Sequence, residues 1–389
     1  MSMRSVELFS GCGGLALGLS RSGFDHLKMV EWNGQAVETV LHNKTAGIEY
    51  VGHWPIERAD VRDVDWRPFR DQVELVAGGP PCQPFSIGGK HKGLEDPRDM
   101  WPQAIRAVRE MSPAAFLFEN VKGLSRSSFS DYLAWITASL RYAGMAPLPG
   151  DDHAAHVRRV ESVAKKADYN VIVCKVNAAD YGAPQKRHRV IVAGVKAIPG
   201  VGIEPMAPTH SRERLLWDQF VTGTYWERHK MPRPGDGAID RADLSVVLKL
   251  RHSGVQPVGL PWVTVRDALV GLGEPNGKLN HVRQDGARAY PGHTGSPLDQ
   301  PAKALKAGDH GVPGGENMMV LDDGGVRYFT TREAARLQCL PDDYEFPRSW
   351  TESMRQLGNA VPVALGEAVG RWIRDQMSEM SQVNSKRAA

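Results

Sequence analysis

The sequence predicts an α/β protein in which a mostly parallel sheet and its helices occupy the first 197 residues and a smaller, irregular domain follows. Short apolar runs alternate with helical patterns up to about residue 197, which indicates strands joined by crossover helices. Proline and glycine then become frequent, and helical patterns resume only after Arg327. The length of 389 residues also favours two domains. We therefore expect residues 1–197 and 327–380 to form the α/β domain, 198–326 the second domain, and 381–389 a disordered tail.

Six apolar runs are the expected strands, and the segments between and after them have helical spacing. The expected strands are Val6–Phe9, Leu27–Val30, Val73–Ala77, Ala115–Phe118, Tyr169–Lys175 and Arg189–Ala193. The expected helices are Leu15–Ser20, Gln35–His42, Pro102–Met111, Phe129–Ala143, Thr331–Cys339 and Val361–Met377. Within the second domain, three tryptophans indicate a packed core rather than a linker: Trp217, Trp226 and Trp262.

Composition excludes several classes of protein. A hydrophobic fraction of 41% and a charged fraction of 24% are ordinary for a folded globular chain. No apolar run approaches the roughly 18–20 residues of a membrane helix, and no signal peptide precedes the first strand, so we expect a cytoplasmic protein. The net charge of +3 suits a nucleic-acid binder only if the basic residues gather on one face. Four cysteines without CxxC spacing predict neither a disulfide framework nor a metal site.

The first expected strand runs into a glycine-rich turn, Phe9-Ser10-Gly11-Cys12-Gly13-Gly14. Such a turn lets the backbone approach a ligand and exposes the N–H groups of the next helix, which suits a nucleotide-like cofactor. A tight strand-to-helix turn without any ligand also needs glycine. Glu31 ends the second strand, where it could accept from ribose hydroxyls, and Asp60 could accept from an adenine amino group. A solvated acid at a strand end is the alternative for each.

A rigid loop follows the third listed strand, in the segment Gly78–Ser86. Two glycines and two prolines present Cys82 at the expected sheet edge, as nucleophilic catalysis requires, whereas Cys174 and Cys339 suit small buried fillers. The next residues are rich in glycine and basic side chains, which is typical of a mobile lid over a phosphate backbone. Its basic residues include Lys90, Lys92 and Arg98.

Three further segments carry candidate functional groups. Glu119 ends an apolar strand and could serve as a proton donor, although a helix cap or surface acid is the simpler interpretation. Arg187 and Arg189 share one face by period-two alternation, which favours a bound anion or an oriented carboxylate over a solvated strand entrance. Gly358–Pro362 reads as the end of one helix and the start of another.

In this order, the segments resemble the DNA cytosine-5 methyltransferase family of bacterial restriction–modification systems. The resemblance covers most of the chain outside about Ile198–Val326, where the family keeps a variable target-recognition domain. It implies a Rossmann-like, S-adenosylmethionine-dependent methyltransferase domain with a smaller, irregular target-recognition domain. It implies the catalytic residues Cys82, Glu119, Arg187 and Arg189. It implies the cofactor-binding residues Phe9, Ser10, Gly11, Cys12, Gly13, Gly14, Glu31, Trp32, Asp60, Val61, Pro80, Asn359 and Val361.

The implied reaction is methyl transfer from S-adenosyl-L-methionine to carbon 5 of a cytosine flipped out of duplex DNA. The Cys82 thiolate would add to carbon 6, Glu119 would hold or protonate ring nitrogen 3, and Arg187 would hold the carbonyl oxygen with support from Arg189. The expected DNA contacts are Gln83, Ser86, Lys90, Lys92, Arg98, Lys303 and Lys306, with Asp309 and His310 as further candidates. We expect a monomer, and the sequence leaves open whether a separate cognate restriction endonuclease exists.

Three alternatives remain at this point. One branch resembling the family acts on tRNA, but the second domain of about 120–130 residues favours sequence reading on DNA. A non-catalytic DNA-binding relative would have no reason to keep Cys82, Glu119, Arg187 and the glycine turn together. A dehydrogenase is disfavoured because the turn lacks the GxGxxG form. The recognition sequence cannot be read from the chain.

Overall fold

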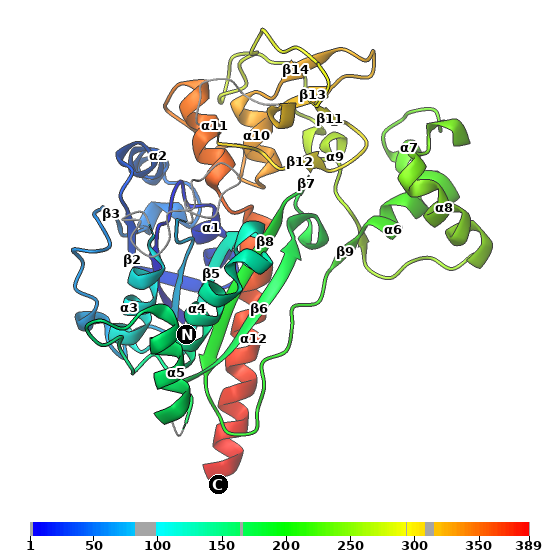
Figure 1. Ribbon diagram of the computed structural model, residues 1–389. Helices are drawn as coiled ribbons and strands as arrows, with labels where there is room; N and C mark the ends of the chain where they lie inside the picture. The colour runs from blue at the N-terminus through cyan, green and yellow to red at the C-terminus, as the bar shows by residue number, and fades with distance from the viewer. Residues whose placement is uncertain (1–2, 82–98, 164–165, 293, 308–314, 389) are drawn as a thin grey trace.

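The computed structural model describes residues 3–81, 99–163, 166–292, 294–307 and 315–388. Its centre is a seven-stranded sheet of strand order β3-β2-β1-β4-β5-β8-β6 (Figure 1). The strands are β1 (Met3–Leu8), β2 (Phe24–Glu31), β3 (Ile56–Arg58), β4 (Leu75–Gly78), β5 (Ala115–Val121), β6 (Tyr169–Asn177) and β8 (His188–Lys196). All neighbouring pairs are parallel except those of β8, which runs antiparallel to β5 and β6. The six predicted strands are confirmed, and β3 is a short additional strand at the edge.

Helices cover both faces of the sheet (Figure 1). They are α1 (Gly14–Arg21), α2 (Gly34–Thr45), α3 (Trp101–Met111), α4 (Ser130–Arg141), α5 (His153–Val163) and α12 (Val363–Ala388). Side chains alternate along β5: Phe116 and Phe118 pack with α3 and α4, whereas Leu117 packs on the opposite face with α1 and α12. The two covered faces make this a three-layer α/β architecture.

The two ends of the chain meet where α1 crosses α12. A Cβ atom on Gly18 would lie 2.5 Å from the backbone of Gly366, so the two helices approach backbone to backbone. Met377 and Met380 of α12 are buried in the same core. The helix continues beyond them to Ala388, through residues 381–388 that the sequence analysis expected to be disordered.

The irregular second region has two parts. The first, residues 209–262, is a helical unit whose ends are joined by the parallel strands β9 (His210–Ser211) and β10 (Leu260–Pro261). It contains α6 (Arg212–Leu216), the π-helical turn η7 (Trp217–Thr222), α7 (Thr224–Arg228), the 3-10 turn η8 (Asp236–Ala238) and α8 (Arg241–Ser253). Leu216, Phe220, Ile239 and Val247 form its own small core. Trp217 and Trp226 are buried and Trp262 packs beside Trp226, which confirms the packed core predicted from the tryptophans.

The second part shares its core with the cofactor side of the sheet. Its elements are α9 (Val265–Leu269), β11 (Ser296–Pro297), β12 (Ala302–Lys303), β13 (Met318–Val320), β14 (Val326–Tyr328), α10 (Thr331–Leu337) and α11 (Trp350–Asn359). Val265, Leu305 and Phe329 belong to the same cluster as Ala16 and Val40 of α1 and α2. Strand β12 also pairs with β7 (Gln185–Lys186), which leads into β8. This part is therefore continuous with the large domain.

Six 3-10 turns complete the described chain: η1 (Val51–His53), η2 (Arg67–Phe69), η4 (Lys122–Ser125), η5 (Ser127–Phe129), η6 (Ala178–Tyr181) and η9 (Gly315–Asn317). Over the described ranges, no helix has both the length and the apolar character needed to cross a membrane. The same ranges hold no group of three or more His, Cys, Asp or Glu side chains that could bind a metal ion.

Candidate active site

The candidate site lies where the carboxyl ends of β1, β2, β4 and β5 meet. The register pairs Leu8 with Gly78 and Gly78 with Phe118, so the residues that follow these strands gather at one edge. A Cβ atom on Gly79 would lie 3.6 Å from Oε2 of Glu119. The backbone that leads to the cysteine loop therefore passes beside the Glu119 carboxyl group. Cys82 itself lies outside the described residues, as do Gln83, Ser86, Lys90, Lys92, Arg98, Asp309 and His310.

Glu119 forms an ion pair with Arg189. The Arg189 Nε atom contacts Glu119 Oε1, and the two side chains are only 13% and 10% exposed. The β5–β8 register brings them together, since Val121 pairs with Arg189 and Glu119 pairs with Ile191. An enclosed pair of this kind fixes the direction of the carboxylate and supplies a guanidinium beside it.

Asn120 holds the start of the cysteine loop. Its Nδ2 atom donates to the carbonyl oxygen of Pro80 at 3.0 Å, and its Oδ1 atom accepts from the Val121 N–H at 2.9 Å. Its position near the end of an apolar strand was the signal available in the sequence, because an amide buried there requires hydrogen-bond partners.

Arg187 bonds to the backbone of two distant segments. It is fully buried, and its two terminal nitrogens donate to the carbonyl oxygens of Leu305 (3.1 Å) and Gly358 (2.6 Å). Burial lowers the pKa of Arg187, and the charge of Arg189 lowers it further. Arg187 stands between β7 and β8, so one continuous strand does not place both arginines on the same face. Arg189 contacts Glu119, whereas Arg187 joins two backbone segments.

The glycine turn joins the beginning and the end of the chain. Gly11 and Gly13 have φ of +55° and +83°, and a Cβ atom on Gly13 would lie 2.5 Å from the Trp54 ring. A Cβ atom on Gly14 would lie 2.3 Å from the Val361 carbonyl oxygen. The turn therefore packs directly against the segment that leads into α12.

The Glu31 carboxylate bonds to the backbone of this turn and of the turn before α2. Its Oε2 atom accepts from the Gly11 N–H at 2.8 Å, and its Oε1 atom accepts from the Asn33 N–H at 2.7 Å. Asn33 in turn caps α2 through its side chain, which accepts from the Ala36 N–H. One carboxylate thus orders two turns that face the same space above the sheet.

A model of C-5 cytosine-specific DNA methylases matches residues 3–146, 148–215 and 270–375. The chain belongs to this family. It is a DNA cytosine-5 methyltransferase, and enzymes of this family use S-adenosyl-L-methionine. Residues 216–269, which make up most of the helical unit, lie outside the match.

Two curated relatives align with nearly the whole methylase. Type II methyltransferase M.PspPI of Psychrobacter sp. is 29% identical over 371 residues, which is 95% of this chain and 78% of the relative. Type II methyltransferase M.NgoMIV of Neisseria gonorrhoeae is 27% identical over 376 residues, covering 96% and 97%.

Solved structures support the fold of the methylase. A DNA modification methyltransferase encoded within an E. coli prophage has a TM-score of 0.56 at 22% identity, covering 96% of this chain and 99% of that one. The Dnmt2 methyltransferase of S. pombe has a TM-score of 0.54 at 18% identity, with the same coverage. The predicted Rossmann-like methyltransferase fold is therefore confirmed.

Buried acidic and polar groups of the methylase suit a cationic cofactor. Glu7, on β1 just before the turn, is 1% exposed, and neither carboxyl oxygen has a hydrogen-bond partner among the described residues. Burial raises the pKa of Glu7, and the charge of Glu31 raises it further, so the neutral acid is favoured. The Ser10 hydroxyl is also buried without a partner. S-adenosylmethionine carries a sulfonium and an ammonium group, which the Glu31 carboxylate beside the turn would favour. An acid within an apolar strand was the signal for Glu7 that sequence reasoning missed.

The other expected cofactor residues have different surroundings. Trp32 is 62% exposed, and the guanidinium of Arg62 lies over its ring at 5.5 Å from the centroid. Arg62 also bonds to both carboxyl oxygens of Asp60, and this contact lowers the pKa of Asp60. The Val61 side chain is buried in the core, so only its backbone can face a ligand. Arg62, two residues after Asp60, was not foreseen.

Cys12 and Asn359 complete the cofactor side. The Cys12 thiol is buried, which raises its pKa to about 12, and its carbonyl oxygen accepts from the Tyr344 hydroxyl at 2.7 Å. Asn359 ends α11 with an exposed side chain. Cys12 is therefore a packing residue of the turn, whereas the Asn359 side chain is exposed at the end of α11.

The two expected DNA-contacting lysines outside the cysteine loop lie close to the large domain. Lys303 pairs directly with Lys186 across β12 and β7, and its Nζ atom donates to the Thr294 hydroxyl. Lys306 is paired with Glu316 at 2.6 Å, while its side chain stays 64% exposed.

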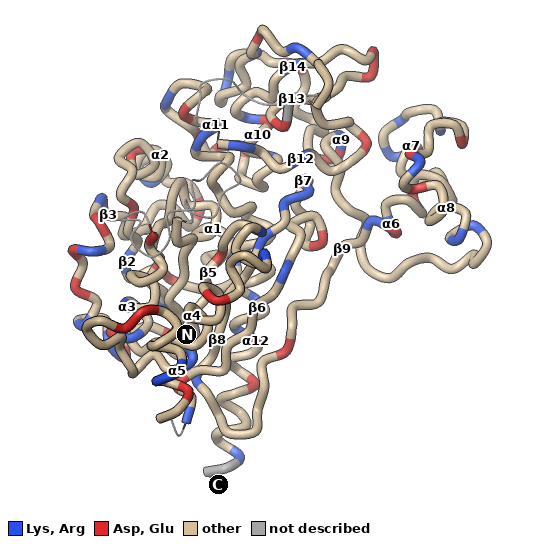
Figure 2. The backbone as a smooth tube through the Cα atoms, viewed as in Figure 1, with Lys and Arg blue, Asp and Glu red and all other residues tan. Residues whose placement is uncertain are grey.

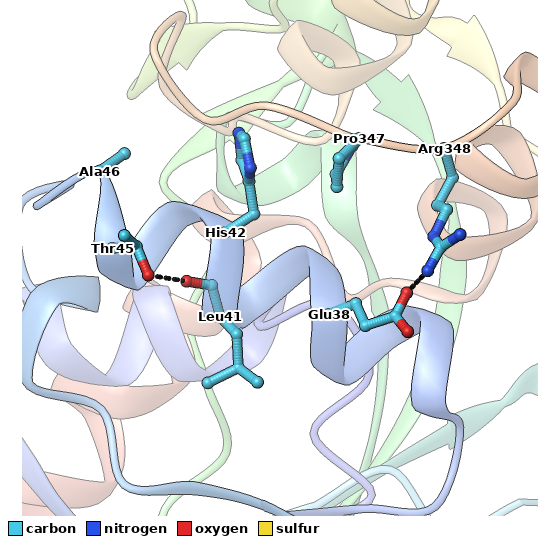
Figure 3. Close-up of a pocket in the computed structure, with 7 residues that line it drawn as sticks. All are labelled: Glu38, Leu41, His42, Thr45, Ala46, Pro347 and Arg348. Carbon is cyan, nitrogen blue, oxygen red and sulfur yellow. Dashed lines mark hydrogen bonds and ion pairs between the residues drawn. The ribbon is translucent and has the colours of Figure 1, made fainter.

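A groove of about 620 Å³ lies on the outer side of α2 and is separate from this site (Figure 3). It is lined by Glu38, Leu41, His42, Thr45, Ala46, Pro347 and Arg348. The ion pair between Glu38 and Arg348 joins α2 to the segment before α11 across one end of the groove (Figure 3). None of the expected site residues lines it, so it is not the candidate cofactor site.

Proposed function

We propose that this methylase modifies one cytosine within a defined DNA sequence, through a transient bond between Cys82 and carbon 6 of the flipped-out base. The ion pair of Glu119 and Arg189 carries the proposal. Asn120, next to Glu119, holds the Pro80 carbonyl two residues before Cys82 in the sequence, which supports a reaction at this edge. A nucleophile, an acid and a guanidinium at one place are the groups that this reaction needs.

Cytosine carbon 5 is a weak nucleophile until a thiolate adds at carbon 6. The Cys82 sulfur forms the bond to carbon 6, and Glu119 gives a proton or a hydrogen bond to ring nitrogen 3, so the added electron pair reaches carbon 5. Arg189 holds Glu119 in position and faces the carbonyl oxygen at carbon 2. S-adenosylmethionine, when bound, supplies the methyl group to carbon 5. A base then removes the proton from carbon 5, and the electron pair released expels the Cys82 thiolate.

The glycine turn and its acidic neighbours are the proposed cofactor site. Glu31 would accept from the ribose hydroxyls, Asp60 from the adenine amino group, and the Trp32 ring would pack against the base. The Arg62 side chain bonds to Asp60 and covers the face of the Trp32 ring, so cofactor binding would require this side chain to move.

We infer that the substrate is double-stranded DNA and that a cognate restriction endonuclease acts separately on the same sequence. The names of the curated relatives, which are type II methyltransferases, support this inference. These relatives come from bacteria, whose chromosome lies in the cytoplasm, and we propose the same location.

Bisulfite sequencing of DNA from cells that express the protein tests the proposed function. Cytosines should be protected in one recurring sequence, and Cys82→Ser should abolish this protection because a hydroxyl is a far weaker nucleophile than a thiolate at neutral pH. The parent, but not Cys82→Ser, should form a covalent complex with DNA that contains 5-fluorocytosine. Protection by Cys82→Ser at the parent's level would remove Cys82 from the mechanism.

A further inference from the structure

A group of basic side chains adjoins the Glu119–Arg189 pair and takes no part in the reaction described above. Lys122 begins η4 directly after β5, Arg126 follows this turn, and His188 is the first residue of β8. Because Val121 pairs with Arg189, the next residues outward along the two strands are Lys122 and His188. We call Lys122, Arg126 and His188 the β5–β8 basic cluster.

The cluster has no acidic partner. Lys122, Arg126 and His188 are exposed, and none forms an ion pair with a carboxylate in the part of the chain that the structure describes. The acid that influences His188 is Asp180, whose Oδ1 atom accepts from the Trp262 indole at 2.9 Å. Partial burial lowers the pKa of His188 first, and the charges of Lys122 and Arg189 oppose its protonation as well. Among the described residues, the positive charges of Lys122 and Arg126 are therefore not compensated by a carboxylate, whereas the lowered pKa favours the neutral form of His188.

The same sign of charge continues toward the second region. Lys186 and Lys303 occupy directly paired positions on β7 and β12, where like charges repel each other. Burial lowers the pKa of Lys186, with further contributions from Arg212 and Lys303. Figure 2 shows basic residues at β7 and along the adjoining strands. A polyanion along this edge would relieve the repulsion.

We propose that Lys122, Arg126 and His188 bind backbone phosphates of the DNA strand that carries the target cytosine. The inference rests on the proposed function, which requires the target base to reach Glu119. The phosphates next to a flipped nucleotide must then pass the carboxyl end of β5 and the adjacent amino end of β8. The cluster lies at these strand ends. Phosphate contacts position the duplex without reading its sequence, so these residues act on affinity and placement rather than on specificity.

The chain offers a matched control for these charges. Arg141 is an exposed arginine at the last position of α4, the helix that begins four residues after Arg126. Asp168, which leads into the first residue of β6, donates its N–H to the Arg141 carbonyl. Arg141 therefore lies at the opposite edge of the sheet, where Arg141→Ala removes the same charge far from Glu119.

The test measures how salt weakens binding to a mixed-sequence DNA duplex of about 30 base pairs. The logarithm of the binding constant falls linearly with the logarithm of the salt concentration, with a slope of about 0.9 for each neutralised phosphate. Lys122→Ala and Arg126→Ala should each reduce the slope by about 1, and the double variant by about 2. Arg141→Ala should keep the parent's slope. Lys122→Arg and Arg126→Lys should restore it, which a general loss of folding would not allow.

Two further measurements separate this proposal from the proposed function. Affinity for S-adenosylmethionine, measured by calorimetry, should be equal in all variants. If the double variant kept the parent's slope, or if Arg141→Ala lowered the slope equally, the phosphate assignment would be overturned. If the parent transferred no methyl group to genomic DNA, the proposed function would fail, whatever the slopes of the variants.

Discussion

The guanidinium of Arg189 lies against the Glu119 carboxylate, whereas that of Arg187 is enclosed and bonded to two backbone carbonyls. The two arginines stand only two residues apart, and both have little exposure. Their partners differ because the chain leaves β7 and enters β8 at this point. A buried guanidinium that bonds to two separate segments is structural, whereas one beside a candidate acid can act on the reacting base.

Substitution should separate these two tasks. Arg189→Ala should reduce methyl transfer at least about 100-fold, because a preorganised charge beside the base is lost, while cofactor affinity stays unchanged. Arg187→Ala should lower the free energy of unfolding by on the order of 3 kcal/mol, since two buried carbonyl groups lose their charged donor. Single-turnover rates and thermal unfolding of both variants give the comparison. Full activity in Arg189→Ala, together with unchanged stability in Arg187→Ala, would contradict the assignment.

Residue identity could be predicted at this site more readily than residue environment. The order of the glycine turn, Glu119 and the two arginines in the sequence was sufficient to indicate the family. The partners of Arg187 depend on where Leu305 and Gly358 return in space, 118 and 171 positions later in the chain. Strand periodicity carries no information about such distant contacts.

At the scale of elements, close backbone contacts join the first turn to the last motif. The α1–α12 crossing depends on Gly18 and Gly366, and the turn itself touches the Val361 carbonyl at Gly14. These contacts bring residues from both ends of the chain to one cofactor site. These close approaches are possible only because glycine has no side chain, since protein interiors leave no spare volume for one.

Gly14→Ala should push the segment at Val361 away from the turn. Its Cβ atom would lie 2.3 Å from the Val361 carbonyl oxygen, and overpacking of this kind costs about 1–3 kcal/mol. Both thermal stability and affinity for S-adenosylmethionine should fall. Gly235→Ala is the matched control, since a Cβ atom there meets nothing within 4 Å. A Gly14→Ala protein with the parent's melting temperature and cofactor affinity would show that the two segments do not depend on each other.

The sequence predicted the sheet strands better than the helix ends. Apolar runs mark the six strands because both faces of the sheet are covered. The length of α12 was underestimated because its last part carries few apolar residues, and only Met377 and Met380 reveal that the helix still packs on the core. The direction of β8 could not be foreseen, because periodicity is the same for parallel and antiparallel strands.

At the scale of the whole molecule, the irregular region divides into a part that shares the large domain's core and a part that does not. Val265, Leu305 and Phe329 pack with α1 and α2, so an exchange of all residues from 198 to 326 would cut through a common core. The helical unit, residues 209–262, has a core of its own, and most of it lies outside the family match. It is therefore the part that can vary without disturbing the cofactor site.

Two carboxylates outside the helical unit bond to it, and each would keep another hydrogen-bond partner if the unit were removed. Tyr225 donates to Asp299, but Asp299 is also bonded to Arg266 at 2.7 Å. Arg228 donates to Asp267, but Asp267 also accepts from Thr264. Both acids would keep a partner if the unit were absent, so the remaining core should stay folded.

Deletion of residues 212–259, with β9 and β10 joined by a short glycine-serine linker, should leave cofactor affinity and cooperative unfolding intact. If residues 198–326 are the target-recognition domain, the deletion should weaken the choice of DNA sequence, because this domain would lose most of its helical unit. Calorimetry with S-adenosylmethionine and bisulfite sequencing of DNA from expressing cells measure the two effects separately. Loss of cofactor binding would show that the unit supports the common core after all. If the cofactor were bound and the parent's sequence still methylated, specificity would lie in the remaining part, where Lys303 and Lys306 adjoin the large domain.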